Sequence, residues 1–518
     1  MNSKITEIQE QINNLKTRRS PREKIWRELK KWICPWRGRF DDAGTPYDRD
    51  EEELALFTGA AGQSVLRGAS GMTSGMTPRA AAWFKPEFEE EWMREADGAR
   101  AWLDRLDGRI KDCLAEGGFY QAIQIFNADL LWSGCALLYS EAEGAGMRYE
   151  SIQTGTYCVA LNNAGSLEAV ARTLLMTASD LERCFGRENM SEAARGKLAK
   201  NPWEPLRIVH FVRRRGERIE SWWLEENARD KALREATFFE MPYFFAVWNE
   251  GATPYGTGPG DEVLADARQM DLLERNKLAA LGKLADPPVV AHPSLKDSMD
   301  LEPGGITFAN ENLRLAPLLD LGPAAQAMRP IQEEIQTVRE RLDIGLMASI
   351  FSSIPLDQRP RDMSATEFLE RKRESLQQLG PVISAYEPNV LVPCLARTMG
   401  ALYRAGRFPK VPDSLKGVFL PMKIEFVSPL ANALRQTTAE SARALFQDAA
   451  AMAQASGNPE IFDKLNLDQI IDELATGMGA PGSIVRSDDE TAQIRQQRAA
   501  RQEEERQMAQ LREIMAKG

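Results

Sequence analysis

Residues 258–288, GPGDEVLADARQMDLLERNKLAALGKLADPP, decide the architecture of this chain because they predict one long helix with well-defined ends. Pro259 suits the first turn of a helix, and Asp261 places an acidic side chain near the positive end of the helix dipole. Asp286-Pro287-Pro288 stops the helix. At 1.5 Å per residue, a helix over residues 259–285 is roughly 40 Å long.

A second helix of similar length is predicted over residues 323–350, after Gly322-Pro323, because apolar residues recur there at three- and four-residue spacing. Two helices cannot form a core alone, so their apolar stripes must meet other helices, and copies of the chain around a ring would supply them. The side chains predicted to pack in this way are Val263, Ala267, Met270, Ile331, Ile335, Val338, Leu342 and Leu346.

The turn before the first helix is Tyr255-Gly256-Thr257-Gly258-Pro259. It superficially resembles a phosphate-binding loop, but it lacks the G-x-G-x-x-G spacing and Pro259 has no backbone N–H to donate. We interpret it as a tight structural turn that leads into the helix.

Length and composition are those of a soluble globular protein of two to four domains: 518 residues, 43% hydrophobic and 27% charged. No apolar run approaches the roughly 18 residues of a membrane span, and residues 1–26 do not resemble a secretory signal. The six cysteines are scattered, which predicts reduced, buried thiols in a cytoplasmic protein and no structural zinc site. The formal charge of −11 argues against tight static DNA binding but allows a surface along which DNA slides.

The regions on either side of the helical pair predict an α+β fold that is predominantly helical. Before the pair, the periodicity predicts helices at 3–33, 51–76, 97–115, 119–133 and 179–199, and strands in an antiparallel sheet at 136–139, 147–150, 157–161, 170–174, 206–213, 217–225 and 237–248. Between the two helices, residues 286–322 predict a small subdomain of turns and strands. After them come a proline-interrupted helix over 364–407, a strand at 422–427 and helices over 431–518.

Signals for catalysis are weak. His210 and His292 are the only histidines, and His210 lies in an apolar strand, where a hydrogen-bonded core histidine is the favoured interpretation. No G-x-x-x-x-G-K-[ST] motif occurs. The acidic runs at 51–53, 89–91 and 503–505 are interpreted as solvated surface. The sequence therefore predicts no catalytic residue, no metal, no cofactor and no enzymatic activity.

One loop is a candidate contact for DNA. Gln358, Arg359 and Arg361 lie in the proline-bearing segment after the second long helix. If that segment faces a DNA path, its two guanidinium groups could contact phosphates without reading bases. Otherwise it is an ordinary surface loop.

Four local patterns in order along the chain resemble the portal, or head-to-tail connector, proteins of short-tailed bacteriophages. They are residues 69–78 (ASGMTSGMTP) with Ala82-Trp83-Phe84, residues 255–259 (YGTGP) opening a helix that closes on Asp286-Pro287-Pro288, residues 363–367 (MSATE) with Arg371, Glu374 and Leu379-Gly380-Pro381, and residues 426–431 (FVSPLA). The resemblance covers about residues 20–435, while the segment from there to the C-terminus matches in character only.

The resemblance implies a ring of twelve identical subunits, with a formal charge of about −132, at one vertex of a virion capsid. It implies a wing over 1–258, stem helices at 259–285 and 323–350, a clip at 286–322, a tunnel loop at 351–363, a kinked wing helix and strand at 364–430, and a crown or barrel at 431–518. The implied partners are the terminase large subunit, tail adaptor or nozzle proteins, major capsid and scaffolding proteins, and non-specific double-stranded DNA. Assembly would take place in the host cytoplasm.

Two other classes of function stay open at this point. One is a subunit of a nucleic-acid-processing enzyme, against which the shortage of histidine and the lack of a spaced carboxylate set weigh. The other is a cytoplasmic assembly scaffold without a DNA path.

Overall fold

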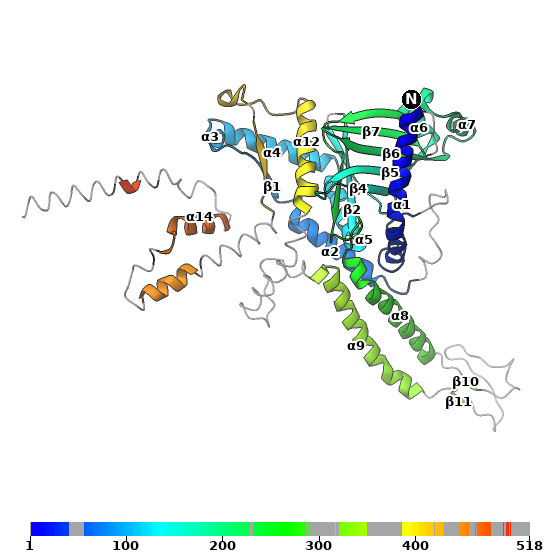
Figure 1. Ribbon diagram of the computed structural model, residues 1–518. Coiled ribbons are helices and arrows are strands. Elements are labelled where there is room, and N and C mark those ends of the chain that lie inside the picture. Colours follow the sequence, from blue (N-terminus) through cyan, green and yellow to red (C-terminus); the bar gives the residue numbers. More distant parts are fainter. Residues whose placement is uncertain are drawn as a thin grey trace, which may run out of the picture.

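The fold is that of a helix-rich α+β protein, seen in a computed structural model (Figure 1). The residues that the structure describes are 2–40, 56–144, 146–226, 231–285, 289–290, 316–317, 321–349, 386–418, 420–428, 443, 445–454, 462, 464–477, 491, 494–496 and 498. Within them, no helix has the length and apolarity to cross a bilayer. The predicted fold class is confirmed.

Helices and strands alternate in blocks through the N-terminal half. The helices before the hairpin are α1 (Asn2–Trp32), α2 (Ala60–Met76), α3 (Glu91–Glu95), α4 (Ala99–Glu116), α5 (Phe119–Ser133), α6 (Ala178–Phe185), the short 3-10 helix η2 (Arg187–Asn189) and α7 (Glu192–Lys200). The strands there are β1 (Phe84–Phe88), β2 (Cys135–Glu143), β3 (Gly146–Ile152), β4 (Tyr157–Leu161), β5 (Leu167–Thr177), β6 (Pro205–Arg215), β7 (Arg218–Glu225), β8 (Arg234–Phe238) and β9 (Tyr243–Val247).

The strands form separate antiparallel sheets, where the sequence predicted one. A five-stranded sheet has the order β4-β5-β6-β7-β8, and a three-stranded sheet has the order β3-β2-β9. The predicted single strand over 237–248 is wrong because the chain leaves the first sheet at Phe238 and enters the second at Tyr243. Pro242, just before β9, has no N–H to extend a ladder.

Helix α1 covers one face of the five-stranded sheet (Figure 1). Its first turns bury Ile5, Ile8, Ile12 and Leu15 against Phe211 and other apolar side chains of the sheet. Alternation along β6 sends Val209 and Phe211 to this face, and His210 and Val212 to the other. Farther along α1, Trp26 and Leu29 join the main core.

Three predicted elements need further correction. The helix over 51–76 begins only at Ala60, because the backbone N–H groups of Phe57 and Thr58 donate to Asp271 in a non-helical segment. The helix over 179–199 is broken at Gly186, whose φ of +81° is left-handed, and Ser191 caps the next helix. Cys184 is exposed, although the other five cysteines are buried as predicted.

The two long helices run in opposite directions and form a hairpin that projects from the rest of the molecule (Figure 1). They are α8 (Pro259–Ala285), as predicted, and α9 (Leu321–Gly345), which ends five residues earlier than predicted. Between them the structure describes β10 (Val289–Val290) paired with β11 (Ala316–Pro317). Residues 321–322, predicted as the end of the small subdomain, are the first residues of α9, and the other residues predicted for that subdomain lie outside the described part.

After the hairpin the chain returns to the main core. A π-helical turn η4 (Glu387–Leu391) leads into α12 (Val392–Arg404), the 3-10 turn η5 (Asp413–Leu415) and β12 (Met422–Phe426). Strand β12 pairs with β1, so a segment that follows the hairpin in the sequence is joined to one that precedes it. Next to this pair, the Trp83 ring stacks with Phe119 and with Phe426, at centroid distances of 5.9 and 6.4 Å. Of the region after residue 431, the structure describes a helical stretch over residues 445–454, α14 (Leu467–Gly477) with the three residues before it, and isolated residues.

Candidate functional site

The turn at the base of α8 is built around close backbone contacts. A Cβ atom on Gly256, whose φ is +53°, would lie 2.0 Å from the carbonyl oxygen of Asn249. A Cβ atom on Gly258 would lie 2.4 Å from the Cα of Gly134. Only glycine fits at either position. Tyr255 is fully buried, and its hydroxyl accepts a hydrogen bond of 3.1 Å from the N–H of Val159.

A buried ion pair fixes the first turn of α8 to α1. The guanidinium of Arg22 donates to both carboxylate oxygens of Asp261, at 2.7 and 2.6 Å, and to the Ser133 carbonyl at 3.0 Å. The other carboxylate bond of Asp261 comes from the N–H of Gly258 at 2.8 Å, so the same side chain caps the helix. Arg22 is 4% exposed and Asp261 is 18% exposed. We call Arg22, Ser133 and Asp261 the root lock.

The hairpin buries its predicted stripe within one chain. Val263, Ala267, Met270, Ile335, Val338, Leu342 and Leu346 are buried, and Ile331 is partly buried against the same core. From the sequence, other copies of the chain in a ring were expected to cover these side chains. In the structure, the chain itself covers them. Any contact that the hairpin itself makes with a neighbouring copy must therefore use the outer faces of α8 and α9.

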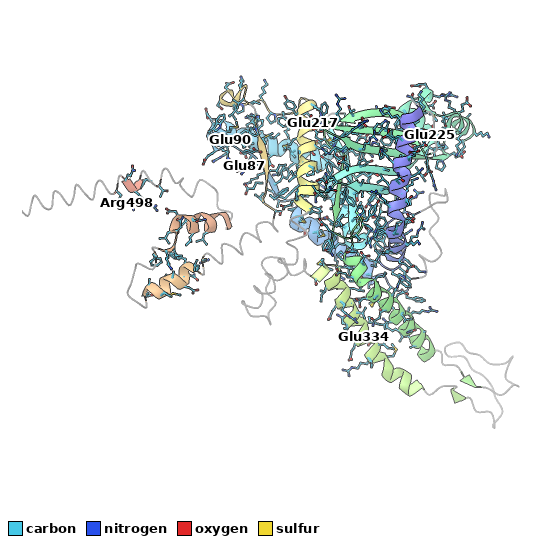
Figure 2. All side chains as sticks on the ribbon, in the orientation of Figure 1. Glu87, Glu90, Glu217, Glu225, Glu334 and Arg498 are labelled. Atoms are coloured by element: carbon cyan, nitrogen blue, oxygen red, sulfur yellow. The ribbon has the colours of Figure 1, made fainter. Side chains whose placement is uncertain are left out.

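Polar pairs tie the two helices together along their length. Gln269 donates to Glu334 at 2.9 Å, and Arg341 contacts both Glu334 and Asp266, at 3.2 and 3.1 Å. Glu334 lies along the hairpin in Figure 2. The Gln269–Glu334 and Arg341–Asp266 contacts fix the register of α8 on α9, since each links one helix to the other, while the Arg341–Glu334 pair lies within α9.

Helix α2 packs against the C-terminal end of α9, which lies nearest the core. A Cβ on Gly68 would lie 2.3 Å from the carbonyl oxygen of Leu346, so Gly68, directly before the 69–78 pattern, allows the two backbones to approach closely. Ser64 and Arg67 both donate to Asp343. Just beyond, Met347 has a left-handed φ of 61°, which ends the helix and redirects the chain.

The predicted DNA-contact residues Gln358, Arg359 and Arg361 lie outside the described residues, as does His292. In the described part of the chain, no cluster of three or more histidine, cysteine, aspartate or glutamate side chains has the arrangement of a metal site.

His210 is a buried, hydrogen-bonded core residue, as predicted. Its Nδ1 lies 2.7 Å from the Tyr243 hydroxyl and its Nε2 lies 2.9 Å from the Ser221 hydroxyl. The ring stacks on Trp223 with a centroid distance of 4.0 Å. Burial, with a smaller contribution from the positive charge of Arg172, lowers the pKa of His210 well below 6.5.

This histidine is expected to make stability fall with acidification. Below its ordinary pKa of about 6.5 the unfolded chain binds a proton that the folded chain rejects, so the stabilisation present above that pH is lost as pH falls. Between pH 6.5 and 5.5 the wild-type chain should lose about 1 kcal/mol more unfolding free energy than His210→Gln. Urea unfolding of both proteins at several pH values measures this difference, and parallel pH curves would contradict it.

Comparison with known proteins gives the family. The profile of the family described as bacteriophage head to tail connecting protein matches residues 5–485. The chain belongs to this family. It is 26% identical over 513 residues to the portal protein of Salmonella phage epsilon15, covering 94% of this chain and 90% of that protein. It is 27% identical over 519 residues to a probable portal protein of Bordetella phage BPP-1, covering 96% and 91%.

Solved structures similar to this connector-family chain include necks of gene transfer agent (GTA) particles. The neck of an empty particle, with C6 symmetry, has a TM-score of 0.32 at 10% identity and covers 80% of this chain and 93% of that chain. The neck of a native particle, with C12 symmetry, has a TM-score of 0.31 at 11% identity and covers 78% and 92%.

In this connector-family chain, sequence reasoning missed the partner of Asp261. A signal was present: Ile8, Ile12, Leu15, Arg19, Arg22, Trp26 and Leu29 alternate at four- and three-residue spacing along α1. Two arginines occupy positions of an otherwise apolar stripe, which predicts buried charges that need partners. Both are largely buried, and Arg22 is the one that holds α8.

Proposed function

We propose that this chain is the subunit of a portal ring of twelve copies at one vertex of a virion capsid, through which double-stranded DNA enters and leaves. The family gives the connector role. The observation that supports ring formation is the helical hairpin. Its inner face is covered by its own chain, and its two outer faces expose apolar and charged side chains that could contact a neighbouring copy.

The outer face of α8 has an apolar stripe. Ala265, Leu272 and Ala279 recur at seven-residue spacing, and all three are exposed, Leu272 by 55%. They lie on the side of the helix opposite Val263 and Met270. Small residues on either side of a leucine allow another helix to approach closely.

The outer face of α9 is the complementary surface. Glu333 and Glu340 are exposed there, and Ile344 is 59% exposed although it is a large apolar residue. The α8 stripe is bordered by Arg268 and Arg275. Opposite charges on the two faces favour packing of α8 of one copy against α9 of the next, and this head-to-tail contact closes into a ring when repeated.

The roles proposed for the remaining segments rest on the resemblance to portal proteins. The clip at 286–322, at the far end of the hairpin, meets the terminase large subunit during packaging and tail adaptor or nozzle proteins afterwards. The tunnel loop at 351–363 presents Gln358, Arg359 and Arg361 to the DNA, and the crown at 431–518 lies inside the head. Major capsid and scaffolding proteins surround the wing, and the ring assembles in the host cytoplasm before it becomes part of the virion.

Ring formation is tested by the mass of the purified full-length protein. Mass photometry is expected to give a particle with twelve times the 58.0 kDa mass of the chain, and negative-stain images are expected to show a central channel. A stable monomer at micromolar concentration under assembly conditions contradicts the proposal.

Charge reversal in the tunnel loop is expected to impair packaging without affecting the ring. In Arg359→Glu/Arg361→Glu, two carboxylates per subunit repel duplex phosphates, so packaged DNA should fall on the order of tenfold. Nuclease-protected DNA in a packaging reaction measures the effect, with Arg218→Glu on the wing as the matched control. A scaffold without a DNA path predicts no difference between the two variants.

A further inference from the structure

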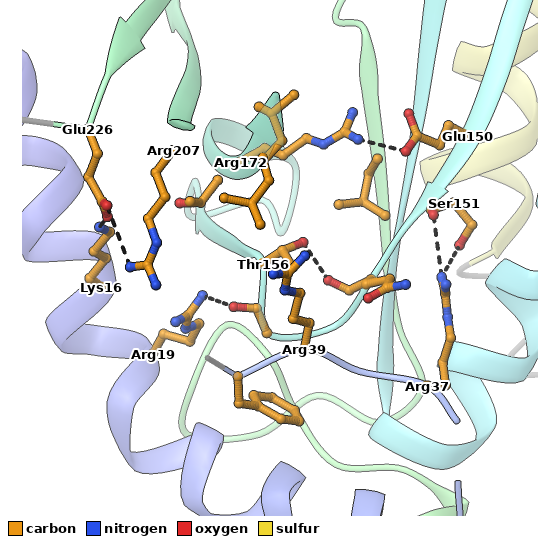
Figure 3. Close-up of a pocket in the computed structure, with 17 residues that line it drawn as sticks. Lys16, Arg19, Arg37, Arg39, Glu150, Ser151, Thr156, Arg172, Arg207 and Glu226 are labelled. Carbon is orange, nitrogen blue, oxygen red and sulfur yellow. Dashed lines mark hydrogen bonds and ion pairs between the residues drawn. The ribbon is translucent and has the colours of Figure 1, made fainter. Parts of the chain in front are cut away.

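We infer that a cavity beside α1 is a binding site for a phosphate group. The cavity has a volume of about 370 Å³ and lies between α1, the turn after β3 and strands β5 and β6 (Figure 3). Six cationic side chains line it: Lys16, Arg19, Arg37, Arg39, Arg172 and Arg207. The inference is independent of the proposed portal role.

The carboxylates of the cavity are fewer than its cations. Glu150 and Glu226 are the acidic residues among its described lining, and two carboxylates outside the lining, Asp129 and Glu23, pair with Arg37 at 2.6 Å and with Arg19 at 2.9 Å. Glu226 is shared between Lys16, at 2.9 Å, and Arg207, at 3.6 Å. Glu150 pairs with Arg172 at 2.7 Å. Among the described residues, these four carboxylates face six cations, so the cavity has a net positive charge that a bound anion would neutralise.

Arg19 is held largely by uncharged acceptors. Its Nη1 donates to the carbonyl oxygens of Gly155 and Tyr157, at 2.5 and 3.1 Å. Its other contact is Glu23, which Arg27 also contacts. Carbonyl oxygens orient a guanidinium without cancelling its charge. Arg19 Nε is buried and has no acceptor among the described residues, so one donor of this guanidinium is unsatisfied.

The positive charge of this cavity is not shared by the cavity next to it. An adjoining cavity of about 440 Å³ is bordered by the same Lys16–Glu226 pair, but Lys16 is its sole cation among described residues and both Glu225 and Glu226 line it. The whole chain carries a net charge of −11. A concentration of arginine here is therefore a local feature and does not follow from overall composition.

Arginine-rich concave sites select phosphate. The planar guanidinium offers paired N–H donors that match the oxygens of a phosphate group, and the dianion compensates two charges at once. The volume is at the lower end for ligand sites, which suits one phosphate-bearing group and excludes a double helix. That group belongs either to a small solute, such as pyrophosphate or a nucleotide, or to the terminal phosphate of a single strand.

Binding is tested by calorimetric titration of pyrophosphate into the full-length protein at low salt. We expect saturable binding near one site per chain and a rise in Tm, because a ligand that binds only the folded state stabilises it. Arg207→Gln and Lys16→Gln should each weaken binding roughly tenfold by removing a charge-assisted hydrogen bond. The matched control Arg218→Gln removes an exposed arginine outside the cavity and should leave binding unchanged.

A variant that is expected to bind pyrophosphate more tightly tests whether misfolding explains the weaker binding of the other variants. Glu226→Gln removes the carboxylate that competes with the ligand for Lys16 and Arg207, so it should tighten pyrophosphate binding severalfold. A folding defect cannot produce tighter binding. Absence of saturable binding, or equal affinities for Arg207→Gln and Arg218→Gln, overturns the inference.

Further titrations distinguish the source of the phosphate. A small solute is indicated if pyrophosphate or ATP binds and the affinity depends on Arg207. A strand end is indicated if a 5′-phosphorylated oligonucleotide binds much more tightly than both pyrophosphate and its unphosphorylated counterpart, again through Arg207. Binding of poly-glutamate in preference to every phosphate compound overturns the assignment to phosphate.

Discussion

Asp261→Asn is expected to lower the free energy of unfolding by about 3–5 kcal/mol, because it leaves the buried guanidinium of Arg22 without a counter-charge. The asparagine oxygen can still accept from Gly258, so the helix cap survives and the loss isolates the ion pair. Urea unfolding followed by tryptophan fluorescence measures the change, since Trp26 donates to the same Ser133 carbonyl as Arg22.

The matched control joins the same two helices. Glu28 on α1 and Arg268 on α8 form an ion pair of 2.5 Å, but their side chains are 50% and 47% exposed. Glu28→Gln should therefore cost at most about 1 kcal/mol. The double variant Arg22→Met/Asp261→Asn should be more stable than Asp261→Asn alone, because no charge is left buried. Equal losses for Asp261→Asn and Glu28→Gln would show that the root lock contributes no more than a surface pair.

Leu272→Glu is expected to convert rings into monomers while leaving the subunit folded. In the proposed ring this side chain packs on α9 of the next copy, so a carboxylate there is buried without a partner at every interface, at a cost of several kcal/mol each. In the free subunit Leu272 is 55% exposed, and the change should alter unfolding free energy by no more than about 0.5 kcal/mol. Mass photometry and urea unfolding separate the two effects.

Two further variants sharpen the result. Leu272→Ala keeps the position apolar and should still form rings, at higher protein concentration than the wild type. Ile344→Glu places the same charge on the opposite outer face, of α9, and should also give monomers, since a head-to-tail contact uses both faces. Rings of wild-type mass from Leu272→Glu would exclude this face of α8 from the interface.

Sequence reasoning succeeded where the deciding signals are local. Proline and glycine at the ends of α8 gave its bounds, and apolar spacing gave α1 and α5. It failed where a distant contact decides. Residues 56–59 are not helical because Asp271, which lies far away in the sequence on α8, accepts from the backbone N–H groups of Phe57 and Thr58. Strand β1 was not predicted, and it is paired by β12, which lies after the hairpin.

The sequence by itself determined the two long helices, the glycine-dependent turn before them and the α+β class, because backbone conformation and the spacing of apolar residues are properties of neighbouring positions. The tertiary structure decided which residues meet: the side chain of Arg22 with that of Asp261, the backbone of Gly68 with that of Leu346, and the cations from residues 16 to 207 around one cavity. Such pairs depend on how the helices and sheets pack. A buried charge needs a partner, but the neighbouring positions in the sequence do not identify that partner. Packing also decided that the hairpin fills its inner stripe from its own chain and leaves the outer faces of α8 and α9 exposed.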